Sequence, residues 1–418
     1  MPRQYTECLS AVVLPQPPVH RNAWRELWLI TIGHGLTHWY PATFYLLLPL
    51  IGSELGLSYS QIGLIMTCQY IASAIANVPG GVLVDTVGRK GLLMAVSLFW
   101  IGFPYLLIGF THSYGMLLAC VALVGFGNSL WHPTAIPTLG RRYPERKGLV
   151  LSVHGMGGNV GDAVAPVVVG AALTYFTWRE VVVLNVVPGL VVAALLFVFL
   201  GSLRLGARKP EAETQSFAAY FAGLKDLFRS RALVLLSTGS AFRTLTQTTL
   251  LTFLPVYLAH DMGYSPFWVG AGLFVLQAAG FAASPLAGHL SDRMGRKHIL
   301  MSSMAASGVV LAAMAFTGGS PLFIALVAVL GFFLYATRPV IQAWMLEATP
   351  KNMGGSSIGV LFGAQALGGA LGPLLGGFVA DRYGLLATFY FLAATIVIAN
   401  LFIIGVRSPP RSAAAPRG

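Results

Sequence analysis

The segment GVLVDTVGRK at residues 81–90 recurs as GHLSDRMGRK at residues 288–297, a displacement of 207 residues. The displacement persists outside this decapeptide, because ALVGFGNSLWHP at residues 122–133 aligns with AVLGFFLYATRP at residues 328–339 after a shift of 206. Single residues keep the same register: Gly63 aligns with Gly270, Gly161 with Gly368, Pro166 with Pro373 and Gly170 with Gly377. Chance does not preserve one register across four separated segments. The chain therefore consists of two related halves of equal length.

The composition indicates a membrane protein. Of the 418 residues, 56% are hydrophobic and only 10% are charged, whereas soluble domains carry roughly 25% charged residues. The 48 glycines and 24 prolines lie within apolar runs, which excludes a disordered chain. The net charge of +12 suits the Lys and Arg of cytoplasmic loops better than nucleic-acid binding. Cys8, Cys68 and Cys120 are widely separated and show no spacing for a disulfide or a metal.

Twelve apolar runs are each long enough to cross a bilayer, which takes about 20 residues. Polar or Gly/Pro-marked breaks separate them. They cover approximately residues 26–50, 60–83, 91–110, 115–138, 148–174, 181–202, 232–258, 265–289, 298–317, 321–345, 355–379 and 385–406. Since lipid does not tolerate an open sheet edge, these runs are predicted to be helices. The predicted fold class is an all-α membrane protein with twelve transmembrane helices in two pseudo-symmetric six-helix bundles.

The repeat and the breaks define five regions. They are an N-terminal tail (1–25), a first six-helix bundle (26–202), a linker (203–231), a second six-helix bundle (232–406) and a disordered C-terminal tail (407–418). Within the linker, Phe217, Phe221, Leu224 and Phe228 follow helical spacing, which predicts an amphipathic segment on the membrane surface or simply a helical linker. Most Lys and Arg fall on the side of both termini, which predicts that both termini are cytoplasmic.

The motif G-x-x-x-D-x-x-G-R-K of both halves resembles the signature loop of the major facilitator superfamily, and the resemblance covers roughly residues 25–406. LVGFGNSLWHP at residues 123–133 and HGMGGNVGDAVAP at residues 154–166 are similar to fosmidomycin-resistance-type exporters. The resemblance implies a monomeric secondary transporter of the inner or plasma membrane that works by alternating access and needs no cofactor. Two positions depart from antiporter motifs, since Val121 occupies a usual arginine position and Ala165 replaces a glycine.

The resemblance also implies that the two signature loops latch the halves together on the cytoplasmic face. The latch residues are Gly81, Asp85, Gly88 and Arg89 in the first half and Gly288, Asp292, Gly295 and Arg296 in the second. The first glycine allows close helix approach, the second allows a tight reversal, and the carboxylates can accept hydrogen bonds at helix ends. The simpler alternative is a basic turn that only sets the topology. We predict that Asp85→Asn lowers transport and leaves membrane insertion intact.

Polar groups inside the predicted spans identify candidate binding residues, because desolvating an ionisable side chain is expensive. Under the repeat shift, Thr37 superposes on Arg243 and His132 superposes on Arg338. These residues lie on spans 1, 4, 7 and 10, which line a central cavity in the resembled family. Two arginines in such a cavity favour an anionic solute such as a phosphonate or carboxylate. The candidate substrate-binding residues are Thr37, His38, His132, Arg243, Gln247, Arg338 and Gln342. Alternatively, both arginines are structural and bond helix carbonyls or Asp162.

Asp162 is the one acid of the sequence that falls deep within a predicted span, and it is the candidate proton carrier. His154, about two turns before it, and His34 complete the predicted proton-coupling residues. In the alternative interpretation, Asp162 only bonds a neighbouring helix and never exchanges a proton. The intramembrane histidines also suggest a transition-metal path. However, no H-x-x-x-D or Cys-rich set completes a ligand shell, so the sequence predicts neither a metal nor a cofactor.

Together with these features, the resemblance to exporters implies proton-coupled export of small, anionic compounds, with the solute, protons and the lipid bilayer as partners and no nucleic acid. Two alternatives stay open, namely proton-coupled uptake of an organic anion and a non-transporting membrane sensor on the same scaffold. A sensor needs neither deep titratable groups nor the signature loop in both halves. An enzyme is not expected, because the sequence has no nucleophile elbow, metal-ligand cluster or phosphate-binding loop.

Overall fold

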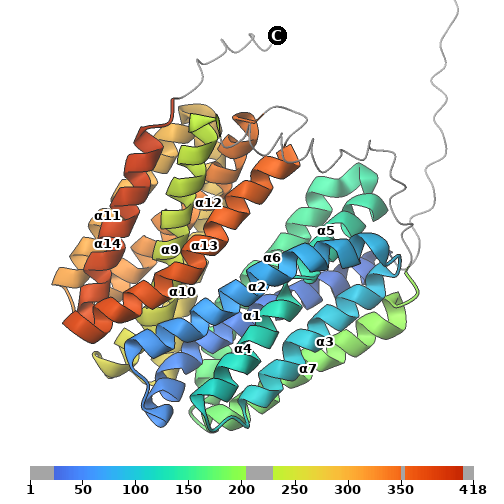
Figure 1. Cartoon of the computed structure of the whole chain (residues 1–418), viewed down its shortest axis with the longest axis horizontal. Coiled ribbons are helices and arrows are strands. Elements are labelled where there is room, and N and C mark those ends of the chain that lie inside the picture. Colours follow the sequence, from blue (N-terminus) through green and yellow to red (C-terminus); the bar gives the residue numbers. More distant parts are fainter. Residues whose placement is uncertain (1–22, 204–228, 350–353, 408–418) are drawn as a thin grey trace, which may run out of the picture.

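A computed structural model describes residues 23–203, 229–349 and 354–407 and shows a helical molecule in two halves (Figure 1). The halves meet at one end and diverge toward the other, where the described chain stops before the linker at residue 203 and resumes after it at residue 229. The predicted amphipathic segment of the linker lies outside the described residues, as do nearly all of the two predicted tails.

Six spans form each half. The first half contains α1 (Ala23–Leu55), α2 (Tyr59–Thr86), α3 (Lys90–Ile108), the consecutive pair α4 (Tyr114–Asn128) and α5 (Trp131–Arg142), the 3-10 turn η1 (Pro144–Arg146), α6 (Lys147–Ala172) and α7 (Trp178–Leu200). The second half contains α9 (Arg231–His260), α10 (Pro266–Met294), α11 (Arg296–Phe316), α12 (Leu322–Glu347), α13 (Gly354–Tyr383) and α14 (Leu385–Ile404). Each predicted span overlaps its helix, and the predicted architecture of twelve spans in two bundles is confirmed.

Apolarity alone does not explain all of the spans. Within the described residues, eight are long and apolar enough to cross a membrane: α3, the α4–α5 pair, α7, and α10 through α14. α1, α6 and α9 are also long, with 33, 26 and 30 residues, but their sequences include His, Asp, Arg or runs of Thr. Because polar groups are expensive in lipid, such helices belong in the interior of the bundles. α1 accordingly packs against α6, α7 and α9, and α9 packs against α13 and α14.

Glycines let the interior helices pack backbone to backbone in the same way in both halves. A Cβ atom at Gly161 on α6 would lie 2.1 Å from the carbonyl oxygen of Gly35 on α1. A Cβ atom at Gly368 on α13 would likewise lie 2.1 Å from the carbonyl oxygen of Ala241 on α9. Gly35 and Ala241 are themselves 206 residues apart, so the repeated sequence produces a repeated helix contact.

The two halves contact each other through α2 with α13 and through α6 with α10. A Cβ atom at Gly63 on α2 would lie 2.1 Å from the carbonyl oxygen of Pro373 on α13. In the second contact, a Cβ atom at Gly270 on α10 would lie 2.1 Å from the carbonyl oxygen of Pro166 on α6. The repeat aligns Gly63 with Gly270 and Pro373 with Pro166, so the two contacts are equivalent. The interface therefore has the pseudo-twofold symmetry that the sequence predicts.

The interface is closed at only one end. Gly63 and Gly270 lie near the ends of α2 and α10 that are remote from the linker. Toward the linker, a Cβ atom would meet no neighbour within 4 Å at Gly155 of α6, at Gly288 of α10 or at Gly359 of α13. The helices that pair at one end therefore leave open space beside them at the other.

Polar contacts between the halves strengthen the closed end. The carboxylate of Asp381, near the end of α13, accepts hydrogen bonds from the backbone N–H groups of Tyr59 at 2.7 Å and Ser60 at 2.9 Å. These N–H groups belong to the first turn of α2, where a carboxylate satisfies otherwise unpaired donors. Ser53 Oγ and His260 Nε2 lie 3.1 Å apart at the ends of α1 and α9. The second half thus caps a helix of the first.

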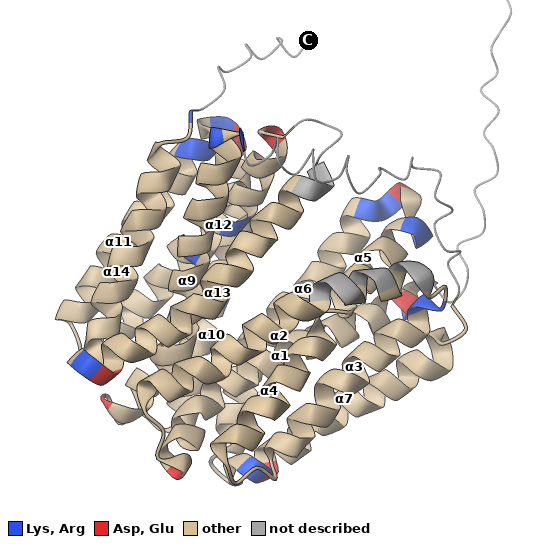
Figure 2. Cartoon of the chain, viewed as in Figure 1, with Lys and Arg blue, Asp and Glu red and all other residues tan. Residues whose placement is uncertain are grey.

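Charged residues of the described chain lie mainly at the two ends of the molecule, and few lie along the helices between them (Figure 2). The linker end carries mainly basic residues, among them Arg142, Arg146, Lys147, Arg293 and Lys297. The closed end carries Arg179 and Arg382 together with Glu54, Asp261 and Asp381. Between the ends, helix faces expose large apolar side chains such as Trp100, Phe197 and Val309. This belt matches the hydrocarbon core of a bilayer, so the chain is an integral, multi-pass membrane protein.

Candidate functional site

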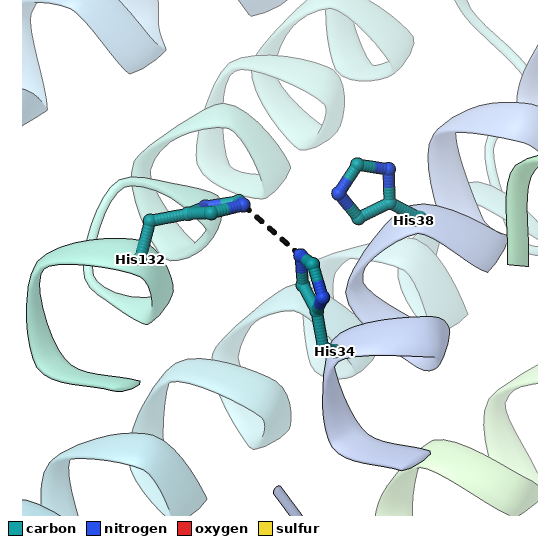
Figure 3. Close-up of side chains that lie close together, drawn as sticks. All are labelled: His34, His38 and His132. Carbon is teal, nitrogen blue, oxygen red and sulfur yellow. Dashed lines mark hydrogen bonds between the residues drawn. The ribbon is translucent and has the colours of Figure 1, made fainter. Parts of the chain in front are cut away.

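Three histidine side chains converge inside the first half (Figure 3). His34 and His38 are one turn apart on α1, and His132 is the second residue of α5. His34 Nε2 and His132 Nε2 lie 3.1 Å apart. One ring nitrogen of each histidine lies within 4.8 Å of the other two. We call His34, His38 and His132 the histidine triad. The sequence assigned these residues to two separate sites, and the fold brings them into one.

Acceptors on α6 orient two of the triad rings. His34 Nδ1 lies 2.6 Å from the carbonyl oxygen of His154, and His38 Nδ1 lies 3.0 Å from Asp162 Oδ2. A carbonyl oxygen only accepts hydrogen bonds, so Nδ1 of His34 carries the proton and its Nε2 presents a lone pair. Opposite an ionised Asp162, His38 takes the same tautomer. Both Nε2 atoms are therefore free to act as acceptors or ligands.

Asp162 contacts His38 and borders the space between the halves. The side chains of His38 and Asp162 are 26% and 30% exposed, although both residues lie well inside their helices. His154, the other proton-coupling candidate on α6, packs against His34 of the triad. Its ring is buried, stacks on that of His34 with a centroid distance of 3.9 Å, and has no hydrogen-bond partner within the described structure. His154 supports the site through its carbonyl group and its ring packing.

A break in the fourth span places His132 in the site. α4 ends at Asn128 and α5 begins at Trp131, and Pro133 is tolerated because it falls in the first turn of the new helix. The buried ring of Trp131 packs directly on Gly33 of α1. Gly158 of α6 provides the space for the rings, since a Cβ atom there would lie 2.8 Å from His34 Cε1. The start of α5 at Trp131 and the missing side chain at Gly158 thus allow the triad rings to come together.

Arg243 occupies a different environment from the one predicted for it. Its side chain is 3% exposed, donates from Nε to Thr337 Oγ1 at 2.9 Å and donates from Nη2 to the carbonyl oxygen of Leu334 at 3.0 Å. These bonds tie α9 to α12 within the second half. In this state the guanidinium bonds within the second half, and contact of Arg243 with substrate stays a prediction. The alternative interpretation, bonding of helix carbonyls, describes the structure.

Arg338 faces the first half. It is exposed although it lies inside α12, and its charge acts on His132 and Tyr70 of the first half as well as on Tyr335 beside it. Gln342, one turn further, is half-buried. Gln247 of α9 is half-buried and lies next to the Tyr335 hydroxyl. These residues, together with His38 and Asp162, present polar groups to the space between the halves.

Thr37 does not belong to this polar surface. Its side chain is fully buried, and its hydroxyl donates to the carbonyl oxygen of His34 at 2.8 Å within α1. Contact of Thr37 with substrate therefore stays a prediction that this state does not display. Position 37 and its repeat partner Arg243 are both buried, because both lie on the side of their helix that packs against other helices of the same half.

The signature loop of the second half makes contacts within its own half. Gly295 adopts φ +98°, which confirms the predicted tight reversal. Arg296 pairs with Asp292 at 2.6 Å and with Glu347 of α12 at 2.8 Å. No helix approaches Gly288, so close packing at that glycine is not found in this state. In the first loop, the side-chain surroundings of Gly81 and Asp85 lie outside the described structure, and the roles of Gly88 and Arg89 stay predictions.

Sequence reasoning missed several polar groups near the site. Tyr45 and Tyr70 lie with their hydroxyl oxygens 3.0 Å apart, and both interact electrostatically with Asp162, as does Tyr335 of the second half. Tyrosine is common in membrane spans, so its presence in the sequence gave no signal. The sequence likewise gave no signal that Asp381 caps a helix, and its partners became visible once α2 and α13 were placed side by side.

The comparison with protein families identifies the chain. The family model of the Major Facilitator Superfamily matches residues 27–283 and 236–418, and the chain therefore belongs to this superfamily of transporters. It is a transporter and not an enzyme.

Three relatives illustrate the range of the family. The chain is 26% identical to the hexuronate transporter of Bacillus subtilis (strain 168), over 85% of this chain and 88% of the relative. It is 28% identical to the multidrug resistance protein MdtG of Proteus mirabilis (strain HI4320), over 93% and 98%. It is 25% identical to the fosmidomycin resistance protein of Escherichia coli (strain K12), over 87% and 88%, which agrees with the resemblance found in spans 4 and 5.

Solved structures share the fold at low sequence identity. The nucleoside transporter NupG superposes with a TM-score of 0.75 at 14% identity, covering 91% of this chain and 98% of that one. A bacterial homologue of the lysosomal transporter Spinster, in an inward-facing and occupied conformation, superposes with a TM-score of 0.73 at 17% identity, covering 93% and 97%.

Proposed function

We propose that this transporter exports small anionic compounds across the inner or plasma membrane in exchange for protons, by alternating access. The observation that carries the proposal is the position of Arg338. Arg338 is an exposed residue inside a span, and its charge acts on His132 of the opposite half. Guanidinium binds carboxylates, phosphonates and sulfonates with paired hydrogen bonds. An anion between the halves would contact Arg338, with Gln247, Gln342 and the Tyr70 hydroxyl as further donors.

The arrangement of the halves supports alternating access. The described state is closed at the end remote from the linker and open toward the linker, so it is inward-facing if the basic linker end is cytoplasmic. With that orientation both termini lie in the cytoplasm. The related glycine contacts in the two halves allow the bundles to rock about the same central site. The chain is proposed to act as a monomer, because each chain contains both halves.

Proton coupling is proposed to act at Asp162. It is the described acid that lies deepest in a span, and its pairing with His38 joins α6 to α1. α6 also contacts α10 of the opposite half. A change in the bond between Asp162 and His38 would therefore act on the interface between the halves. Names of relatives support different flux directions, since two refer to drug resistance and one to transport of a hexuronate, a carboxylate.

The signature loops are proposed to latch the linker end in the opposite, outward-facing state. The open space beside Gly288 supports this, because a helix could pack there once the linker end closes. Asp292 has a 61% exposed side chain in the inward-facing state and remains available for such a contact. The variants Asp85→Asn and Asp292→Asn test the two loops as a matched pair. Both should slow transport without reducing the amount of protein in the membrane.

The deciding experiment is uptake and efflux in proteoliposomes under an imposed pH gradient, with a panel of organic anions and cations. We expect movement of anions that follows the gradient and none of cations. Asp162→Asn should abolish gradient-driven movement and retain anion exchange at zero gradient. Faster movement of cations than anions, or full gradient drive in Asp162→Asn, would contradict the proposal. Entry of anions coupled to entry of protons would support the uptake alternative instead of export.

A further inference from the structure

We propose that the histidine triad is a binding site for one divalent transition-metal ion of the Zn²⁺ class. His34, His38 and His132 offer three imidazole nitrogens within 4.8 Å of one another (Figure 3). Imidazole is the side chain that Zn²⁺ and its neighbours Co²⁺, Ni²⁺ and Cu²⁺ prefer in proteins without a thiolate. The sequence suggested a metal path through the intramembrane histidines but no ligand set, because the third ligand lies 94 residues after His38 and joins the others only in the folded bundle.

The distances fit a tetrahedral ion. Two ligands at a zinc–nitrogen distance of roughly 2.0–2.1 Å are separated by roughly 3.3 Å across a tetrahedral angle. The Nε2 atoms of His34 and His132 are 3.1 Å apart, so they already stand close to this separation. The third nitrogen lies at most 4.8 Å from the other two and needs to move by roughly 1.5 Å, which a small rotation of the half-exposed His38 ring provides.

The surroundings of the triad are those of metal-binding histidines. Such residues usually donate their second ring N–H to a carbonyl or carboxylate group, which fixes the ring and makes the ligating nitrogen more basic. His34 has the His154 carbonyl oxygen in this role at 2.6 Å, and His38 has the Asp162 carboxylate at 3.0 Å. The stacked ring of His154 holds His34 in place. Two orienting contacts of this kind, on rings that converge, favour a metal over a chance cluster.

The hydrogen bond between His34 and His132 also fits a metal site. Two nitrogens 3.1 Å apart cannot both present lone pairs, so one proton lies between His34 and His132 when no metal is bound. A metal ion would take the place of that proton. Three protein ligands leave the fourth position open on the side of His38, which borders the space between the halves. Sites with an open position bind exchangeable ligands, whereas structural zinc sites are closed by four protein ligands.

All three ligands come from the first half, so the site does not depend on which end of the transporter is open. This separates the proposal from the transport mechanism, and metal binding can be measured without any transported solute. Arg338 is the cation of the second half whose charge acts on His132, and it opposes the bound metal. The carboxylate of Asp162 on the other side of His38 offsets that charge.

The test is equilibrium binding of Zn²⁺ to the full-length transporter, purified in detergent with a tag that contains no histidine and stripped with a chelator. We expect one Zn²⁺ per chain with an affinity in the micromolar range or tighter. His132→Gln and His38→Gln should each weaken binding at least 100-fold. Asp162→Asn, which removes an orienting acceptor and no ligand, should weaken it 10- to 100-fold. His298→Gln, an exposed histidine of the second half, is the matched control and should bind as the parent protein does.

Spectroscopy provides an independent readout. Co²⁺ bound in place of Zn²⁺ should give the visible absorption of a four-coordinate ion with nitrogen ligands, and His132→Gln should remove it. Size-exclusion chromatography and thermal unfolding establish that each variant is folded. Absence of stoichiometric binding to the folded parent protein would overturn the proposal. Equal binding by His132→Gln, or equal affinity for Mg²⁺, which prefers oxygen ligands, would overturn it as well.

Discussion

The two halves of this transporter share a backbone arrangement and differ in chemistry. The contact of Gly161 with Gly35 in the first half has its counterpart in that of Gly368 with Ala241 in the second. At the functional positions the correspondence stops. His34 of the first half is replaced by Ser240, whose hydroxyl accepts a hydrogen bond from Gln365, and Asp162 is replaced by a glycine.

The fourth span of each half shows the same division. α4 and α5 are separated by a break that brings His132 to the start of a helix, whereas α12 continues without interruption past Arg338. The first half thus concentrates the groups proposed here to exchange protons or bind a metal, and the second supplies a fixed positive charge. Packing contacts have stayed alike because each must bury the same backbone surfaces. Polar positions are free to diverge because one solute lies between two non-identical walls.

The largest effect is expected where the two halves are alike. Gly63→Val and Gly270→Val each place a side chain against a proline carbonyl of the opposite half, where a Cβ atom would already lie 2.1 Å from the oxygen. The closed end could no longer form, and the initial rate of transport in proteoliposomes should fall at least 100-fold in both variants. Gly115→Val, where a Cβ atom meets no neighbour, is the control. A large loss in only one of the two variants would show that the interface is not functionally symmetric.

Variants of Arg338 test a position at which the two halves differ. Arg338→Ala should raise KM for a transported anion by roughly 10- to 100-fold, because a charge-assisted hydrogen bond contributes about 1.5–3 kcal/mol. Arg338→Lys should recover part of the affinity, since it restores the charge but not the paired geometry. Arg382→Ala at the closed end serves as the control. An unchanged KM in Arg338→Ala, measured by concentration-dependent uptake, would remove Arg338 from the substrate site.

Replacing Arg243 should lower the stability and leave KM unchanged, in contrast to replacing Arg338. Arg243→Met removes the charged donor of Thr337 Oγ1 and of the Leu334 carbonyl group, which keeps only the hydrogen bond from Thr337 Oγ1 at 2.6 Å as its side-chain contact. We expect a loss of about 2–3 kcal/mol in the free energy of unfolding, seen as a lower unfolding temperature in detergent, with KM unchanged in the protein that remains folded. A raised KM without loss of stability would instead reinstate Arg243 as a substrate contact.

The smallest effect concerns the closed end. Asp381→Asn weakens a charged cap on α2 and should favour opening by about 1 kcal/mol, or roughly fivefold in the equilibrium. A cysteine introduced as Ser53→Cys, in a chain without Cys8, Cys68 and Cys120, should then react faster with a membrane-impermeant thiol reagent. Thr174 corresponds to Asp381 in the repeat and bonds only the carbonyl group of Ala171 in its own half. Thr174→Ala should therefore leave the reaction rate unchanged.

Much of the fold follows from the sequence for two physical reasons. The bilayer requires about 20 apolar residues per helix, so the number of spans and their approximate limits are visible as hydrophobic runs. The repeat register then relates helices of one half to those of the other, and it aligns Gly63 with Gly270 and Pro166 with Pro373, which the fold brings into equivalent contacts. Both conclusions follow without knowledge of any interatomic distance. Charge likewise predicts the basic linker end, because Lys and Arg cannot remain in lipid.

The composition of the site depends on helix rotation and on contacts between distant segments, which no periodicity records. Arg243 and Arg338 look equivalent in the sequence, yet the first points into helix packing and the second toward the opposite half. Likewise, His132 joins His34 only because α5 starts afresh at Trp131. A rotation of α9 by half a turn would exchange buried and exposed side chains at no cost in hydrophobic length. The sequence therefore determined which helices cross the membrane, and only tertiary packing decided which polar groups meet.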